Sequence, residues 1–180
     1  MESLAEKLFV FDVVQGAWEH EAKGPGANAR HVLTHMTKSL ITKDFLNPEV
    51  VRDEIAPDSL QYALRFGRWI NLGVVEITKL TNKEERARSG AEMNIGYDTP
   101  WGFPSFVGAT GLLAGHLHDL DHKSTRAASR LKTPEMLRSV ARLLFNSASI
   151  QAFQFGFELD DAFDARLATL RTRFEIPNPQ

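Results

Sequence analysis

Apolar residues recur at intervals of three and four along most of the chain, which is the spacing of one face of an α-helix. In the first segment Leu4, Leu8 and Phe11 follow this spacing. Ser3 and Glu6 form a Ser-x-x-Glu capping box at the start of this segment. No segment alternates convincingly with the period of two that is typical of a half-buried strand. The pattern therefore predicts an all-α fold, a single-domain helical bundle of about six to seven helices over residues 1–180.

Caps, prolines and glycines predict where the first helices begin and end. Asn28 is a suitable N-cap for a second helix, and Asn47 followed by Pro48 predicts a short helix over 47–55. A long helix is expected over 57–80, in which Gly67 and Gly73 are weak points.

The second half of the chain shows the same kind of signals. The polar stretch 81–90 is either an exposed helical extension or a loop, and 94–104 is expected to be an irregular aromatic loop because it holds two prolines and two glycines. Helical spacing resumes over 105–123. The start of the next helix is predicted at Thr133-Pro134-Glu135. A last amphipathic helix is expected over 158–174.

Composition narrows the class of protein. A formal net charge of -2 gives no indication of a nucleic-acid-binding surface, and the absence of cysteine excludes disulfides and thiolate metal ligands. The N-terminal stretch lacks the basic region of a signal peptide, and no apolar run approaches the roughly 18 residues of a membrane span. We expect a cytoplasmic protein. Phe153, Phe155 and Phe157 lie close together, so a homo-oligomer is an open alternative.

Histidines are concentrated in the stretch GHLHDLDHK, residues 115–123. His118 and His122 are four residues apart and so share a helix face, and His31 and His35 repeat this spacing on another expected helix. Two facing helices of a bundle commonly supply such pairs to one metal ion. With a carboxylate beside one pair, the expected ligands of a Zn, Mn, Fe or Ni ion are His31, His35, His118, Asp119 and His122.

Glycines precede these histidines at helical spacing. The positions separated by intervals of three and four are Gly108, Gly111, Gly115, His118 and His122. We expect this glycine seam to face a neighbouring helix, which would turn both histidines inward, whereas His116 is rotated off the seam.

The stretch LLAGHLHDLDH resembles the central helix of HD-superfamily metal-dependent phosphohydrolases, with His118 and Asp119 as the adjacent His-Asp pair. The resemblance implies an earlier histidine ligand, His31 or His35, and a later aspartate on a following helix, Asp160 or Asp161. It also implies a bound metal that polarises phosphate and generates a hydroxide nucleophile.

Residues 118–122 also resemble the HDxxH motif of zinc proteins of ubiquinone biosynthesis, which implies a lyase or biosynthetic enzyme acting on an apolar ring. A looser similarity is to four-helix-bundle metalloproteins of the DinB kind, which combine one helical histidine with an HxxxH pair.

Three functions follow from these features. The first is a metal-dependent hydrolase of a phosphate ester or nucleotide, with Asp121 or Asp161 as general base or last ligand and a small molecule as substrate. The second is the HDxxH-type lyase or biosynthetic enzyme. The third is a non-catalytic helical assembly or binding protein in which the histidine pairs are incidental.

Overall fold

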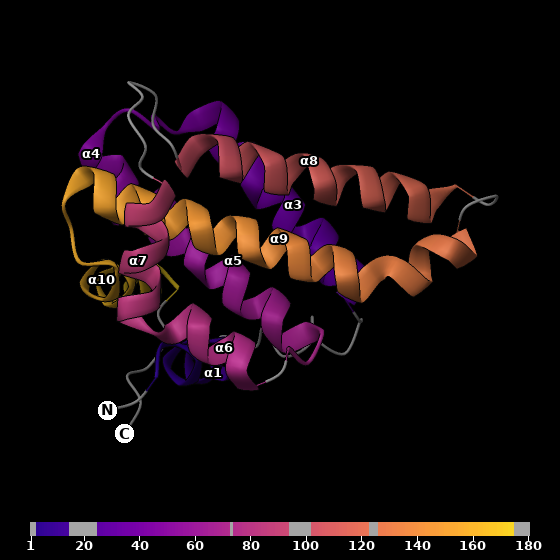
Figure 1. The fold of residues 1–180 in the computed structure, drawn as a ribbon, viewed down its shortest axis with the longest axis horizontal. Helices are drawn as coiled ribbons and strands as arrows, with labels where there is room; N and C mark the ends of the chain where they lie inside the picture. Colours follow the sequence, from indigo (N-terminus) through magenta and orange to yellow (C-terminus); the bar gives the residue numbers. More distant parts are fainter. Residues whose placement is uncertain (1–2, 15–24, 73, 94–101, 123–125, 175–180) are drawn as a thin grey trace.

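We describe the protein from a computed structural model, which describes residues 3–14, 25–72, 74–93, 102–122 and 126–174. These residues form helices and short connections and contain no strand, so the all-α prediction is confirmed for them (Figure 1). The helices are α1 (Leu4–Val14), α3 (Pro25–Thr42), α4 (Pro48–Val50), α5 (Ala56–Trp69), α6 (Val74–Thr81), α7 (Lys83–Met93), α8 (Gly102–Asp121), α9 (Arg126–Phe155) and α10 (Leu159–Arg173), with a π-helical turn at Val51–Ile55.

Helix α9 forms the centre of the bundle. It packs against α8 on one side and α5 on the other, and α3 packs on α8 (Figure 1). Fully buried leucines such as Leu113 of α8, Leu144 of α9 and Leu60 of α5 build the core between them. Burial of each such side chain stabilises the fold by about 1.5–3 kcal/mol.

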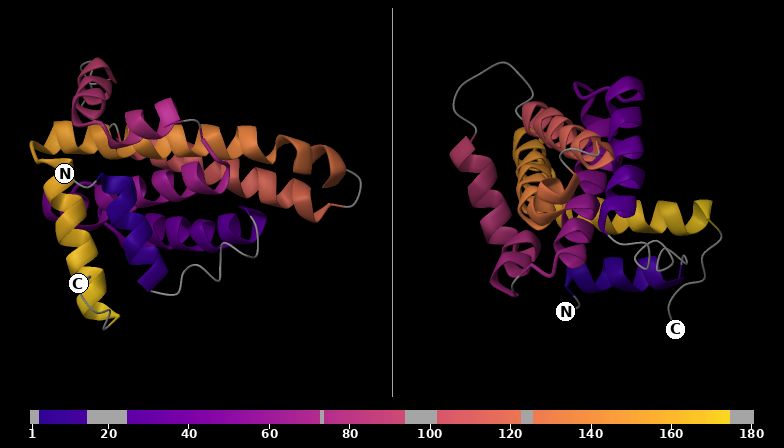
Figure 2. Two further views of the ribbon diagram at one scale, coloured as in Figure 1. Left: turned by 90° about the horizontal axis from the view of Figure 1, so that it is seen from below. Right: turned by 90° about the vertical axis from the view of Figure 1, so that its right-hand side faces the viewer.

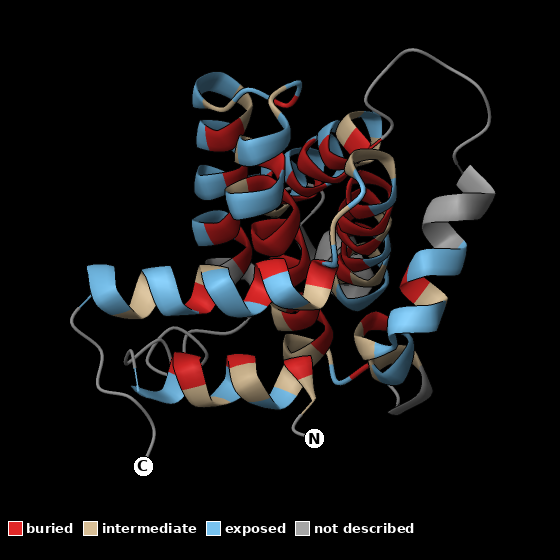
Figure 3. Cartoon of the chain, turned by 90° about the vertical axis from the view of Figure 1, so that its left-hand side faces the viewer, coloured by how far each residue is buried: buried red, intermediate tan, exposed pale blue. Residues whose placement is uncertain are grey.

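Helix α10 runs across the end of α9 rather than along it, and α1 packs beside α10 (Figure 2). Buried residues lie on the sides of α1 and α10 that face the bundle, while their outer sides are exposed (Figure 3). The Arg166 guanidinium holds α10 to α5 through two hydrogen bonds of 2.8 Å to the Asp58 carboxylate. The predicted capping box begins α1, since Ser3 N donates to Glu6 and Glu6 N donates to Ser3 Oγ.

The predicted break before Pro57 is wrong, because α4, the π turn and α5 run on as one continuous helix. Pro57 has no N–H, so the carbonyl of Asp53 would lack its usual helical donor. Directly before the proline the helix widens, and Ala56 N donates to Val51 O, five residues back. The predicted N-cap at Asn47 is confirmed, since its side chain accepts a hydrogen bond from Glu49 N.

The single helix expected over 57–80 is also wrong, because α5 ends at Trp69 and α6 begins at Val74. Leu72 N donates to Gly67 O at 3.0 Å and Asn71 N donates to Arg68 O at 3.2 Å, a Schellman-type ending. Asn71 has a φ of 48°, in the left-handed region that asparagine tolerates better than most residues. The chain therefore turns here and places α6 beside α5.

The polar stretch 81–90, expected to be either a helical extension or a loop, is helical from Lys83 onward in α7. Three other predicted helix starts differ from the structure. Helix α3 begins at Pro25, before Asn28. Pro134 lies inside α9, which begins eight residues earlier at Arg126. Helix α8 already begins at Gly102, so only 94–101 of the expected aromatic loop falls outside the described residues. None of the described helices combines the length and apolar character needed to cross a membrane.

Candidate functional site

Two of the three histidines in the stretch 115–123 are exposed, one in the last turn of α8 and one directly after its end. His118 and His122 are both exposed, and their ring centroids are 4.2 Å apart, as the four-residue spacing predicts. Asp119 is exposed beside them. Asp121 forms an ion pair with Arg30 of α3.

The glycine seam does not face a neighbouring helix, so this prediction is wrong. A Cβ atom placed on Gly111 or Gly115 would meet nothing within 4 Å, and one on Gly108 would meet only Leu143 Cδ1 at 3.8 Å. The inward histidine is His116, which is buried and has its Nε2 atom 3.0 Å from Thr133 Oγ1 of α9. Burial lowers the pKa of His116.

The histidines of α3 form a second exposed pair. The His31 and His35 ring centroids are 4.6 Å apart. Partial desolvation lowers the pKa of His35, and the nearby Asp58 carboxylate of α5 opposes this effect. Within the segments that the structure describes, the two pairs do not come together around one ion.

The structure does not bring the expected ligands together. In the part of the chain that it describes, no three His, Asp or Glu side chains are placed to share a metal ion. Asp160 and Asp161 lie in α10, beyond the C-terminal end of α9. His118 belongs to the last turn of α8, and this end of α8 lies beside the beginning of α9 (Figure 1). The 30 residues of α9 span about 45 Å, at 1.5 Å per residue. Each histidine pair remains a separate two-ligand candidate.

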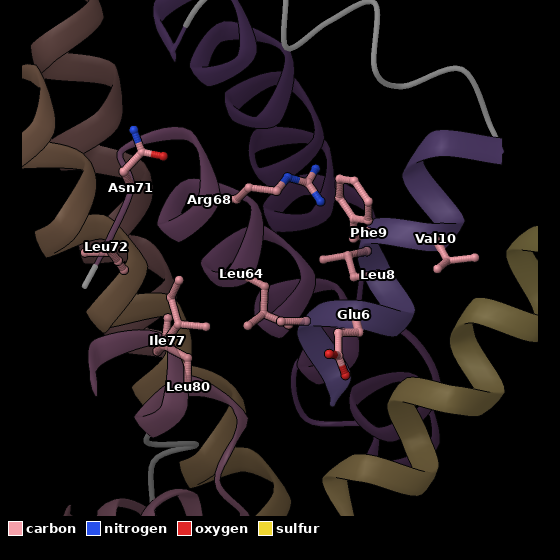
Figure 4. A pocket seen from close by; sticks show the side chains of 11 residues that line it. Glu6, Leu8, Phe9, Val10, Leu64, Arg68, Asn71, Leu72, Ile77 and Leu80 are labelled. Carbon is pink, nitrogen blue, oxygen red and sulfur yellow. The ribbon is translucent and has the colours of Figure 1, made fainter. Parts of the chain in front are cut away.

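A cavity of about 690 Å³ lies elsewhere, where α1, α5 and α6 meet (Figure 4). Its volume falls within the range of small-molecule sites, roughly 300–1,000 Å³. Most of its lining side chains are apolar, and the polar ones are Glu6, Arg68 and Asn71. The apolar lining consists of Ala5, Leu8, Phe9, Val10, Leu64, Leu72, Ile77 and Leu80.

The turn between α5 and α6 creates this cavity. Because Asn71 reverses the chain, Ile77 and Leu80 of α6 are placed opposite Leu64 of α5, and α1 closes the remaining side with Leu8 (Figure 4). The hydrophobic spacing over 57–80 predicted one helix and gave no indication that α6 lies beside α5. The signal in the sequence for a helix end at this point was Asn71, the residue that takes the left-handed conformation.

A group of buried side-chain ion pairs holds α1 against α5 next to the cavity. The Asp12 side chain is only 2% exposed, and its two oxygens accept hydrogen bonds of 2.6 Å from Arg65 and Arg68. Burial alone would lower the pKa of Arg65, but the adjacent Asp12 carboxylate outweighs burial and the pKa is raised. The Arg68 guanidinium carbon also lies 5.6 Å from the centre of the Phe9 ring. These ion pairs fix one polar group, Arg68, at the edge of an apolar cavity.

Comparison of the chain with protein-family models, with curated protein sequences and with solved structures gave no match.

Proposed function

We propose that the protein binds a small molecule with an apolar body and one hydrogen-bond-accepting group, in the cavity between α1, α5 and α6. The observation that carries this proposal is the cavity itself, about 690 Å³ in volume and lined mostly by aliphatic side chains. Sites for small molecules are typically concave and apolar, with few polar groups that fix the orientation of the ligand.

The polar residues suggest how the ligand is oriented. A guanidinium carries only donors, so Arg68 favours an acceptor such as a carboxylate or sulfonate on the ligand. Glu6 contributes less, because its carboxylate accepts a hydrogen bond from Ser3 N at 2.6 Å and its pKa is lowered by that contact. We therefore place the apolar body against Leu64, Ile77 and Leu80, with the acceptor toward Arg68.

The test is titration of the folded protein with 1-anilinonaphthalene-8-sulfonate, followed by displacement with decanoate. We expect saturable binding to one site. Ala5→Trp should abolish binding, because Ala5 lines the cavity on α1 and an indole would fill it. Ile77→Trp should do the same from α6.

The matched control is Ala168→Trp, which adds the same indole to an exposed position of α10, outside the cavity. This variant should bind the probe as the wild type does. Circular dichroism and thermal melting establish that each variant is folded. Unchanged probe binding in the folded Ala5→Trp and Ile77→Trp variants would refute the proposal.

The metal-dependent hydrolase and the HDxxH-type lyase stay predictions of the sequence. Both would require His118 and Asp119 to share a metal ion with a third side chain. Among the residues whose placement is described, no such group is formed.

A further inference from the structure

We infer that His118 and His122, on the outer face of α8, form a two-histidine site for a divalent transition-metal ion such as Zn²⁺, Ni²⁺ or Cu²⁺. This site is independent of the cavity between α1, α5 and α6. It also differs from the five-ligand site that the sequence predicts, because both protein ligands come from one helix.

The geometry of the pair suits chelation. The two rings contact each other edge to face on successive turns, with centroids 4.2 Å apart and planes inclined by 62°. Both side chains are exposed, so an ion reaches them without any rearrangement of the fold. Imidazole nitrogen is a preferred ligand of zinc, copper and nickel.

The electrostatic surroundings of the pair favour a cation. Helix α8 ends at Asp121, so His118 lies in its last turn and His122 directly follows its end. The carbonyl end of a helix carries a partial negative charge. Asp119 and Asp121 flank the pair with carboxylates, although the Asp121 carboxylate is paired with Arg30.

The pair on α3 has the same spacing but different surroundings. His31 and His35 lie inside α3, away from its carbonyl end, and their nearest charged neighbours in the chain are the cations Arg30 and Lys38. Neither the partial negative charge of a helix end nor a carboxylate flanking the pair in the chain therefore favours a cation there. His31 and His35 therefore serve as an internal control, because spacing alone would give both pairs the same affinity.

The ion at His118 and His122 would keep open coordination positions. Zinc usually takes four ligands, and among the described residues no third His, Asp or Glu side chain is placed to bind the same ion as this pair. Solvent fills the remaining positions. We therefore expect an exchangeable ion that an outside ligand can approach.

The experiment is isothermal titration of protein without a polyhistidine tag with ZnCl₂ and, separately, with NiCl₂. We expect one ion per chain for the wild type. His118→Ala and His122→Ala should each show no binding at concentrations that saturate the wild type. The double variant His31→Ala/His35→Ala should retain the wild-type affinity.

Two outcomes would overturn the inference: binding that survives in His118→Ala, or binding that is lost in the double variant of α3. Since His118 and His122 are exposed, neither alanine variant should lower the melting temperature of the metal-free protein. At Cu²⁺ concentrations high enough to load the variant as well, spectra give a second readout, because coordination by two imidazole nitrogens should change to one in His118→Ala. Unchanged nitrogen coordination would also overturn the inference.

Discussion

Helices α5 and α8 both carry several ionisable side chains, but the fold surrounds them differently. On α5 the Asp58, Arg65 and Arg68 side chains are buried or half-buried, and each is paired with a charge on another helix. On α8 the side chains of His118 and His122 lie on the side opposite the core. These ionisable residues on α5 therefore join helices together, whereas His118 and His122 remain open to solvent and its ions.

This difference predicts that removing one partner of an ion pair lowers the free energy of unfolding by unequal amounts at the two places. Asp12→Ala leaves the Arg65 and Arg68 guanidinium groups half-buried without their carboxylate, and breaking a buried pair in this way costs about 3–5 kcal/mol. Asp121→Ala removes the exposed partner of Arg30 and should cost less than about 1 kcal/mol. Urea denaturation measures both values. Equal values would contradict the contrast between α5 and α8.

A smaller effect is expected within α8 itself, between its inward and outward histidines. His116→Ala removes a buried ring and its contact with Thr133, so it should lower the free energy of unfolding by about 1–3 kcal/mol. His118→Ala should change it by less than about 0.5 kcal/mol. Thermal melting of both variants without metal checks this order.

The same histidine predicts a dependence of stability on pH. Because burial lowers the pKa of His116, the unfolded chain binds a proton more readily than the folded one. Its contribution to stability is present above the unfolded pKa of about 6.5 and is lost as the pH falls through and below that value. His35 shifts in the same direction. Between pH 7.5 and 5.5, His116→Ala should therefore lose less stability than the wild type.

The smallest effects are expected for glycine. Gly111→Ala adds a methyl group to open space on α8 and should stabilise the protein by about 0.5–1 kcal/mol, since alanine is the better helix former. At Gly67 of α5, the added Cβ would lie 3.0 Å from Leu72 Cδ1, so Gly67→Ala should give no such gain. A difference in melting temperature between the two variants tests the comparison, and equal stabilisation would contradict it.

Much of the fold could be predicted from local signals. The capping box of Ser3 and Glu6 and the cap at Asn47 act within a few residues, and the structure contains both. Pro57 and Pro134 were each predicted to mark the start of a helix, which is wrong in both cases. A π turn accommodates Pro57, and Pro134 lies inside α9. These outcomes depend on packing against distant helices, which local spacing does not report.

The candidate site was less predictable. Spacing correctly predicted that His118 and His122 would be neighbours, but it could not show which side of α8 faces the core. The larger apolar residues Phe106, Leu113 and Leu117 lie on the opposite side from the glycines, and they are buried. Side-chain size therefore indicated the inward face of α8 better than the spacing of the glycines did, because large apolar side chains gain most from burial.

The π turn at Val51–Ile55 has a consequence for insertions and deletions in the chain. Such a turn holds one residue more than an α-helical turn but advances the helix by about the same rotation. Deleting one residue there would therefore leave Asp58 facing Arg166 and Arg65 facing Asp12, at the cost of the room that the wider turn gives Pro57. Inserting a further residue would rotate α5 by about 100° and separate both pairs. The segment should therefore tolerate a single deletion far better than a single insertion.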